Sequence, residues 1–140
     1  MIEKLDGSVE RIYQDNGSQF KPRFFPVINA LLKQGPMSIK SLSEQTQVSH
    51  SAVSQTVAAM KKIGYVTSEP GEDKRERQIV LTEKMRAELP KLQEIWQAVH
   101  TAAQKLDRET SASLHTTLSL SISALDDKSF YQRISEEMAV

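Results

Sequence analysis

The sequence contains no cysteine, which excludes disulfide bridges, cysteine zinc sites and thiol redox centres. It has no run of about 18 apolar residues, so no segment is predicted to cross a membrane. The first residues are charged and lack the apolar core of a signal peptide. We therefore expect a cytoplasmic protein of one domain, 140 residues long, and we predict neither a metal site nor a cofactor.

The sequence also lacks the motifs of common enzymes. It contains no glycine-rich phosphate loop, no cysteine nucleophile and no evident Ser/His/Asp grouping. His100 and His115 are isolated in helical segments, where a histidine is more often structural or solvated than a metal ligand. The protein is therefore not predicted to be an enzyme. A catalytic pair of carboxylates has no fixed sequence motif, and nothing in this sequence points to one.

The net charge is zero, but the charges are unevenly distributed. Residues 1–20 carry two basic and four acidic side chains, a net charge of −2. Residues 21–86 carry eleven basic and six acidic side chains, a net charge of +5, and residues 87–140 carry five and eight, a net charge of −3. Binding of a polyanion depends on such a local excess, so the middle of the chain is the candidate for nucleic-acid binding.

The spacing of apolar residues predicts a mainly α-helical chain with one β-hairpin. Two strands are predicted at 65–69 and 77–81, joined by Pro70-Gly71 and a charged run. The helices are predicted at 1–15, 22–33, 39 to about 46, 50 to about 63, 82 to about 106, about 110–125 and 130–138. The hairpin is too polar to form a core of its own, so it is expected to project from the helices as a wing.

The two short helices at 39–46 and 50–63 have the form of a helix-turn-helix, with Ser38 and Ser49 as N-caps. The second helix of such a pair enters the major groove and places its first residues on the base edges. Gln55 can form two hydrogen bonds with adenine. The candidate DNA-binding residues of this helix are Ser49, His50, Ser51, Ala52, Ser54, Gln55 and Lys62.

The predicted wing supplies a second group of candidates, Asp73, Lys74, Arg75 and Arg77. An arginine is attracted to the negative potential of a narrow minor groove, so Arg75 is the candidate for insertion there, with Asp73 holding it in place. Lys74 and Arg77 are expected to contact the DNA backbone. A helix pair or a basic hairpin alone is a weak signal, whereas both together, in this order, are more specific.

Several segments resemble the MarR (multiple antibiotic resistance regulator) family of winged-helix transcription factors, over nearly the whole chain. They are Gly35-Pro36-Met37-Ser38, Leu42-Ser43-Glu44, Val48-Ser49-His50-Ser51-Ala52-Val53-Ser54-Gln55, Gly64-Tyr65-Val66, Asp73-Lys74-Arg75 and Leu81-Thr82-Glu83-Lys84. Segments around Pro22, Pro90 and Phe130 resemble a branch that includes modules fused to acetyltransferases. A chain ending at Val140 would be the regulator module alone.

The resemblance implies a winged helix-turn-helix at 19–82, flanked by dimerisation helices at 1–18 and 83–140, within one domain at 1–140. It implies a homodimer that binds a pseudo-palindromic operator in double-stranded DNA, as a repressor that responds to a small-molecule effector. The dimerisation residues would be Leu5, Val9, Ile12, Leu92, Trp96, Val99, Leu114, Leu118, Phe130 and Tyr131. The apolar seam from Met85 to Leu106 is either core of one chain or part of this interface, and Trp96 favours the interface.

Some positions depart from the family pattern. Gln47 stands where many helix-turn-helix turns have glycine, and a positive φ there would cost about 1 kcal/mol. Ala58-Ala59 replaces an Asp-Arg pair, which removes a possible phosphate contact. The alternative function is a dimeric winged-helix module that binds protein without specific DNA binding. Such a module has no need of Arg75 between two further basic residues, so the wing favours DNA.

Overall fold

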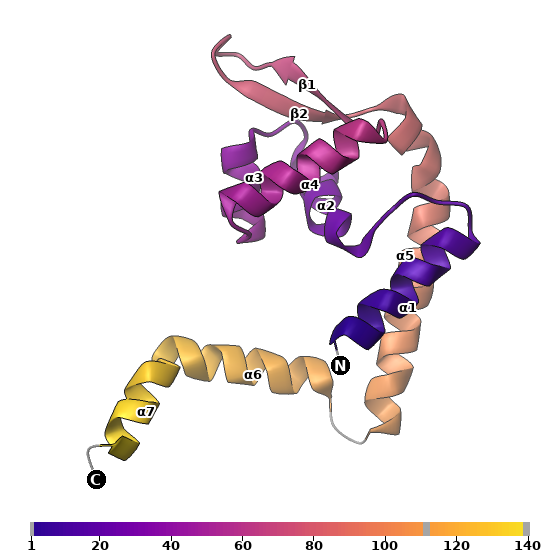
Figure 1. Ribbon diagram of the computed structural model, residues 1–140. Helices are drawn as coiled ribbons and strands as arrows, with labels where there is room; N and C mark the ends of the chain where they lie inside the picture. Colours follow the sequence, from indigo (N-terminus) through magenta and orange to yellow (C-terminus); the bar gives the residue numbers. More distant parts are fainter. Residues whose placement is uncertain (1, 111–112, 139–140) are drawn as a thin grey trace. The chain divides into compact units, whose positions relative to one another are not determined.

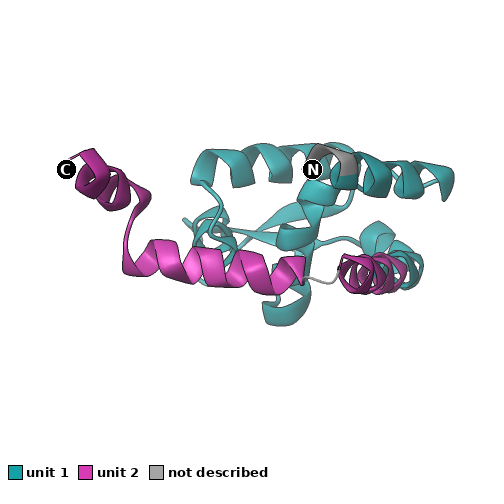
Figure 2. Cartoon of the chain, turned by 90° about the horizontal axis from the view of Figure 1, so that it is seen from below, with its two compact units in different colours: residues 1–96 teal, residues 97–140 magenta. Residues whose placement is uncertain are grey.

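The computed structural model describes residues 2–110 and 113–138, with side chains described from Leu5 onward. They form two compact units, residues 1–96 and residues 97–140 (Figure 2). The elements, shown in Figure 1, are α1 (Ile2–Asp15), the 3-10 helix η1 (Pro22–Phe24), α2 (Phe25–Gln34), α3 (Ile39–Thr46), α4 (His50–Lys62), β1 (Val66–Pro70), β2 (Arg77–Leu81), α5 (Glu83–Glu109), α6 (Leu114–Asp127) and α7 (Phe130–Met138). The predicted fold class, mainly α with a two-stranded wing, is confirmed.

The first unit is a helix-turn-helix packed on α2, with the hairpin along one side (Figure 1). α4 turns one face inward, because Val53, Val57 and Met60 recur at helical spacing and all three are buried. They share a core with residues from the other elements of this unit. The fully buried members include Phe20, Phe24, Ile28, Leu42, Tyr65, Ile79, Met85 and Leu92.

The hairpin is antiparallel, with Val66 opposite Leu81 and Pro70 opposite Arg77. Its outer end is exposed, and its base is tied to the rest of the unit by a bridge between Met37 and Ile79. The Ile79 N–H donates to the Met37 carbonyl at 2.7 Å, and the Met37 N–H donates back at 3.3 Å. This bridge explains how a polar hairpin is held without a hydrophobic core of its own.

Helix ends in the first unit follow the predicted signals. Ser38 caps α3 by accepting from the Ser41 N–H at 3.1 Å, and Ser49 caps α4 by accepting from the Ala52 N–H at 3.3 Å. α4 ends at Lys62, and Gly64 follows two residues later, where its φ of 78° permits the reversal of the chain. These local contacts set the bounds of the two helices of the helix-turn-helix.

The start of α5 belongs to the core of the first unit. Leu92 is only 1% exposed, and the Trp96 indole N–H donates to the Tyr13 hydroxyl at 3.0 Å. The Tyr65 hydroxyl donates to Glu88 at 2.6 Å, and burial together with this acceptor raises the pKa of Tyr65 to about 12. The predicted seam is therefore core of the protomer in its first half, whereas Leu106 in its second half is exposed.

The second unit contains the end of α5, α6 and α7. α6 begins at Leu114, later than the predicted start at Thr110, because Ser113 caps it by accepting from the Thr116 N–H at 3.1 Å. Residues 111–112 of that predicted helix lie outside the described residues. Arg133 of α7 donates to the carbonyls of Ala124 and Lys128, which ties α7 to the end of α6. No residue of α6 or α7 is buried.

No helix within residues 2–110 and 113–138 is both long enough and apolar enough to cross a membrane.

Gln47 occupies the left-handed region, with φ 55° and ψ 29°, and is the only residue other than glycine with positive φ in the described chain. A β-branched side chain there would meet severe steric strain. We expect Gln47→Ile to lower the free energy of unfolding by about 1–2 kcal/mol, measured by urea denaturation, whereas Gln47→Gly should not. Gln45→Ile, on the exposed face of α3, is the control and should cost only about 0.5 kcal/mol. Equal stability of the two isoleucine variants would contradict the strain.

Candidate DNA-binding surface

The first turns of α4 present most of the predicted base-contacting residues to solvent. Ser49, His50, Ser51 and Gln55 are exposed, and Ala52 and Ser54 are half-buried. The burial of the opposite face of the helix determines this orientation, because successive residues are turned by about 100° around the axis. The N–H groups of the first turn point out of the helix end and give it a positive potential suited to phosphate.

Hydrogen bonds inside the turn fix the direction in which α4 begins. The Ser43 hydroxyl donates to the Val48 carbonyl at 2.6 Å, and the Thr46 hydroxyl donates to the Leu42 carbonyl at 2.7 Å. Gln47 reverses the chain between them. Ser43 was not among the predicted site residues, because a serine in a helix has many partners and only the folded turn shows which one it uses.

Lys62 lies at the other end of α4 from the base-contacting group. Twelve residues separate it from His50, which places the two about 18 Å apart along the axis. Lys62 is exposed but does not belong to the same cluster as Gln55. Ala58 is exposed between them and supplies no polar group. The base-contacting candidates of α4 therefore lie in its first two turns, and the exposed Lys61 and Lys62 lie in its last turn.

The tip of the wing is a structured turn. The Gly71 N–H donates to the Glu76 carbonyl at 2.8 Å, and the Glu76 N–H donates to the Asp73 carbonyl at 2.9 Å. The Asp73 carboxylate accepts the backbone N–H of Arg75 at 3.0 Å. Asp73 thus supports the backbone at Arg75, and the guanidinium remains exposed.

The basic side chains of the wing are exposed and unpaired. Within the described parts of the chain, Lys74, Arg75 and Arg77 form no ion pair, whereas other lysines and arginines do. In the view of Figure 1 the tip of the hairpin and the N-terminal end of α4 lie on the same side of the winged unit. The unit therefore offers two exposed polar or basic elements that could face one polyanion.

The described residues contain no cluster of three potential metal ligands.

This combination of a helix-turn-helix, an antiparallel hairpin after its second helix and a basic hairpin tip defines a winged-helix protein. A model of the MarR family matches residues 18–76. Residues 18–76 therefore match the winged-helix domain of the MarR family, as the sequence motifs predicted. No curated protein sequence matches the chain.

Solved structures share this fold along most of the chain. The MosR transcriptional regulator of M. tuberculosis, solved in complex with DNA, has 16% identity and a TM-score of 0.68, over 99% of this chain and 92% of its own. MarR from E. coli has 18% identity and a TM-score of 0.63, over 88% and 89%. A MarR transcriptional regulator from Methanosarcina mazei has 19% identity and a TM-score of 0.62, over 87% and 88%. At such identities the match establishes the shared fold.

The role of Asp73 in the wing can be tested directly. We expect Asp73→Ala to accelerate amide hydrogen exchange at Arg75, measured by NMR, because the acceptor of that N–H is lost. Asp73→Asn keeps an acceptor oxygen and should preserve the slow exchange. Glu72→Ala removes a neighbouring carboxylate with no such bond and serves as the control. Because the turn is exposed, stability should change by no more than about 0.5 kcal/mol. Unchanged exchange at Arg75 in Asp73→Ala would contradict this role.

Proposed function

We propose that the protein is a transcriptional regulator that binds specific DNA sequences as a homodimer in the cytoplasm. The observation that carries this proposal is the unpaired, exposed Arg75 at a structured wing tip, together with the exposed polar start of α4 in the same unit. The MarR-family match and the shared fold with a regulator solved on DNA support the same function.

In this proposal α4 enters the major groove with its first two turns. Gln55 and the serines read base edges, and the helix N-terminus faces a phosphate. His50, Ala52 and Ser49 lie at the same end and complete the contact surface. Lys62, at the far end of α4, contacts at most the backbone. Arg75 enters the neighbouring minor groove, with Lys74 and Arg77 on its phosphates.

A second copy of the chain is the proposed partner of the exposed apolar surface of the C-terminal unit. Phe130 is 66% exposed and Tyr131 is 79% exposed, which is unusual for large apolar side chains. Further exposed apolar residues described in this unit are Leu106, Leu118, Leu120, Ile122, Leu125, Ile134 and Met138. The predicted interface residues Leu5 and Ile12 of α1 are exposed as well. The predicted interface residues Val9, Val99 and Leu114 are half-buried, as is Trp96. Leu92 has no surface left to bury, so we leave it out of the interface.

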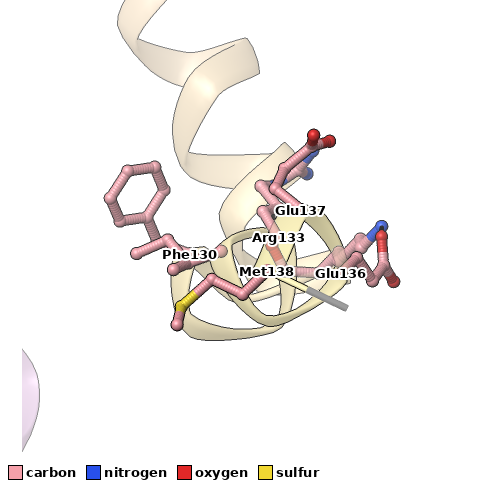
Figure 3. Close-up of a pocket in the computed structure, with 7 residues that line it drawn as sticks. Phe130, Arg133, Glu136, Glu137 and Met138 are labelled. Carbon is pink, nitrogen blue, oxygen red and sulfur yellow. Dashed lines mark hydrogen bonds and ion pairs between the residues drawn. The ribbon is translucent and has the colours of Figure 1, made fainter. Parts of the chain in front are cut away.

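The same apolar surface contains a groove of about 500 Å³ on α7 (Figure 3). Phe130 and Met138 supply apolar lining, and Arg133 and Glu137 line the groove as well (Figure 3). Lys128 forms an ion pair with Glu136 beside it. We assign this groove to the dimer interface, since a partner helix would cover its apolar walls.

The proposed operator, repressor role and effector rest on the likeness to the MarR family. Two-fold symmetry of a dimer implies a pseudo-palindromic operator, with half-sites about 34 Å apart on one face of the duplex. We propose a repressor whose binding is released by a small-molecule effector. The rival function is a dimeric winged-helix module that binds protein and no specific DNA.

Dimerisation through α6 can be tested with matched charge insertions. We expect a dimer at micromolar concentration by analytical ultracentrifugation, and we expect Leu118→Glu to shift it toward monomer, because a carboxylate would be buried in an apolar interface. Thr116→Glu, two positions earlier and therefore on nearly the opposite side of the helix, is the control. A monomeric wild-type protein, or a dimer insensitive to Leu118→Glu, would overturn this interface.

DNA binding can be tested by selecting bound duplexes from a random pool and measuring their affinity against salt. Arg75→Ala should weaken binding by about 1–3 kcal/mol, most of all for duplexes with A·T-rich flanks. Gln55→Ala should instead relax base preference at one position per half-site. Lys105→Ala removes the same charge as Arg75→Ala from the C-terminal unit and should have little effect. Absence of binding at low salt would favour the protein-interaction module.

A further inference from the structure

The C-terminal end of α4 is closed by backbone and side-chain hydrogen bonds. The Tyr65 N–H donates to the Met60 carbonyl at 2.9 Å, and the Gly64 N–H donates to the Lys61 carbonyl at 3.0 Å, which together form a Schellman motif. The carbonyl of Ile63 is left outside this motif. It accepts from the Lys84 ammonium at 2.6 Å. Lys84 thus supplies both a donor and a positive charge to the negative end of the helix dipole.

Thr82 joins the same chain reversal to the start of α5. Its hydroxyl donates to the Gly64 carbonyl at 2.5 Å and accepts from the Met85 N–H at 3.3 Å. Its backbone N–H donates to the Tyr65 carbonyl at 3.1 Å. Thr82 therefore caps α5 and holds the end of α4 with one side chain. We refer to Thr82 and Lys84 with the segment 63–65 as the α4–α5 joint.

The Lys84 side chain is fixed by three neighbours besides Ile63. Its Cδ lies 3.6 Å from the position that a Cβ on Gly64 would occupy, so the stem covers that glycine. Its ammonium lies 5.4 Å above the Tyr65 ring and 3.5 Å from the Gln19 amide oxygen. An exposed lysine usually samples many rotamers. Here the contacts direct its ammonium to the end of α4.

The angle at this joint has a large effect at the other end of α4. The helix has 13 residues and is about 20 Å long. A tilt of about 10° about the joint would move the first turn by about 3 Å, close to the rise of one base pair, about 3.4 Å. Along the chain, α4 is linked to α5 only through the hairpin, so the joint supplies a direct tie between these helices.

We propose that Lys84 and Thr82 are positioning residues for DNA recognition, which hold α4 at a fixed angle to α5 and thereby set the half-site spacing that the dimer accepts. This inference rests on the proposed function, because spacing has meaning only for a dimer on DNA. Lys84 touches no base or phosphate in this role. It acts through the Ile63 carbonyl, and its loss affects the register of α4 more than the number of contacts with DNA.

The experiment uses the full-length protein and Lys84→Met, which keeps the apolar stem and removes the ammonium. The probes are a duplex selected by the wild-type protein from a random pool and the same duplex with one base pair inserted between its half-sites. We expect the variant to bind the selected duplex about three- to tenfold more weakly, and the ratio of affinities for the two duplexes to shrink by a similar factor. The slope of log affinity against log salt should stay unchanged.

Matched variants separate positioning from other roles. Thr82→Val should reproduce the loss of spacing preference, and Thr82→Ser, which keeps the hydroxyl, should restore it. Lys33→Met removes a lysine elsewhere in the winged unit and should leave the spacing preference intact. A salt slope lowered by about 1.8 in Lys84→Met, about 0.9 for each of the two subunits, with spacing preference intact, would show that Lys84 contacts phosphate and would overturn the proposal.

Amide hydrogen exchange, measured without DNA, tests whether Lys84 constrains the α4–α5 joint. In Lys84→Met we expect faster amide exchange at Gly64 and Tyr65, because the end of α4 is less constrained. Unchanged exchange, or a spacing preference equal to that of the wild type, would overturn the joint while leaving DNA binding in place. If the wild-type protein selects no duplex, the proposed function fails and the spacing role fails with it, whatever the exchange data show.

Discussion

The winged unit depends on the burial of one face of α4. Val53, Val57 and Met60 are buried where α4 packs against α3, η1 and β1, and this fixes how α4 is rotated about its axis. Gln55, Ser49 and Ser51 are therefore exposed as a consequence of packing. A recognition surface made of short polar side chains needs such a rigid support, because these side chains have little reach of their own.

The positive charge of the winged unit has two effects, one on a distant polyanion and one on a polyanion in contact with the protein. The winged segment carries a net positive charge between two acidic ones, which would attract a polyanion before contact is made. At contact, the unpaired side chain of Arg75 has no competing partner in the described chain, and its backbone is held by Asp73. By contrast Lys84 belongs to the same basic segment, yet its ammonium is engaged with the end of α4. Net charge alone does not distinguish these two roles.

Much of the fold followed from local signals. The serine caps and the stop at Gly64 were predicted, since each depends on a few neighbouring residues. The predicted start of α6 was wrong by several residues, because serines and threonines supply several possible caps and only one is used. The seam of α5 was left open between core and interface. Its residues have the same periodicity in either case, and Leu92 proved to be core.

The sequence by itself determined the elements, the helix-turn-helix, the wing and the candidate contact residues, because periodicity, caps and turn residues act over short distances. Tertiary structure decided which polar groups meet across the chain. Three hydrogen bonds join residues whose pairing no sequence pattern predicts: Ser43 with Val48, Tyr65 with Glu88 and Lys84 with Ile63. A lysine or serine side chain can reach many acceptors, and only the packed core brings one of them within bonding distance.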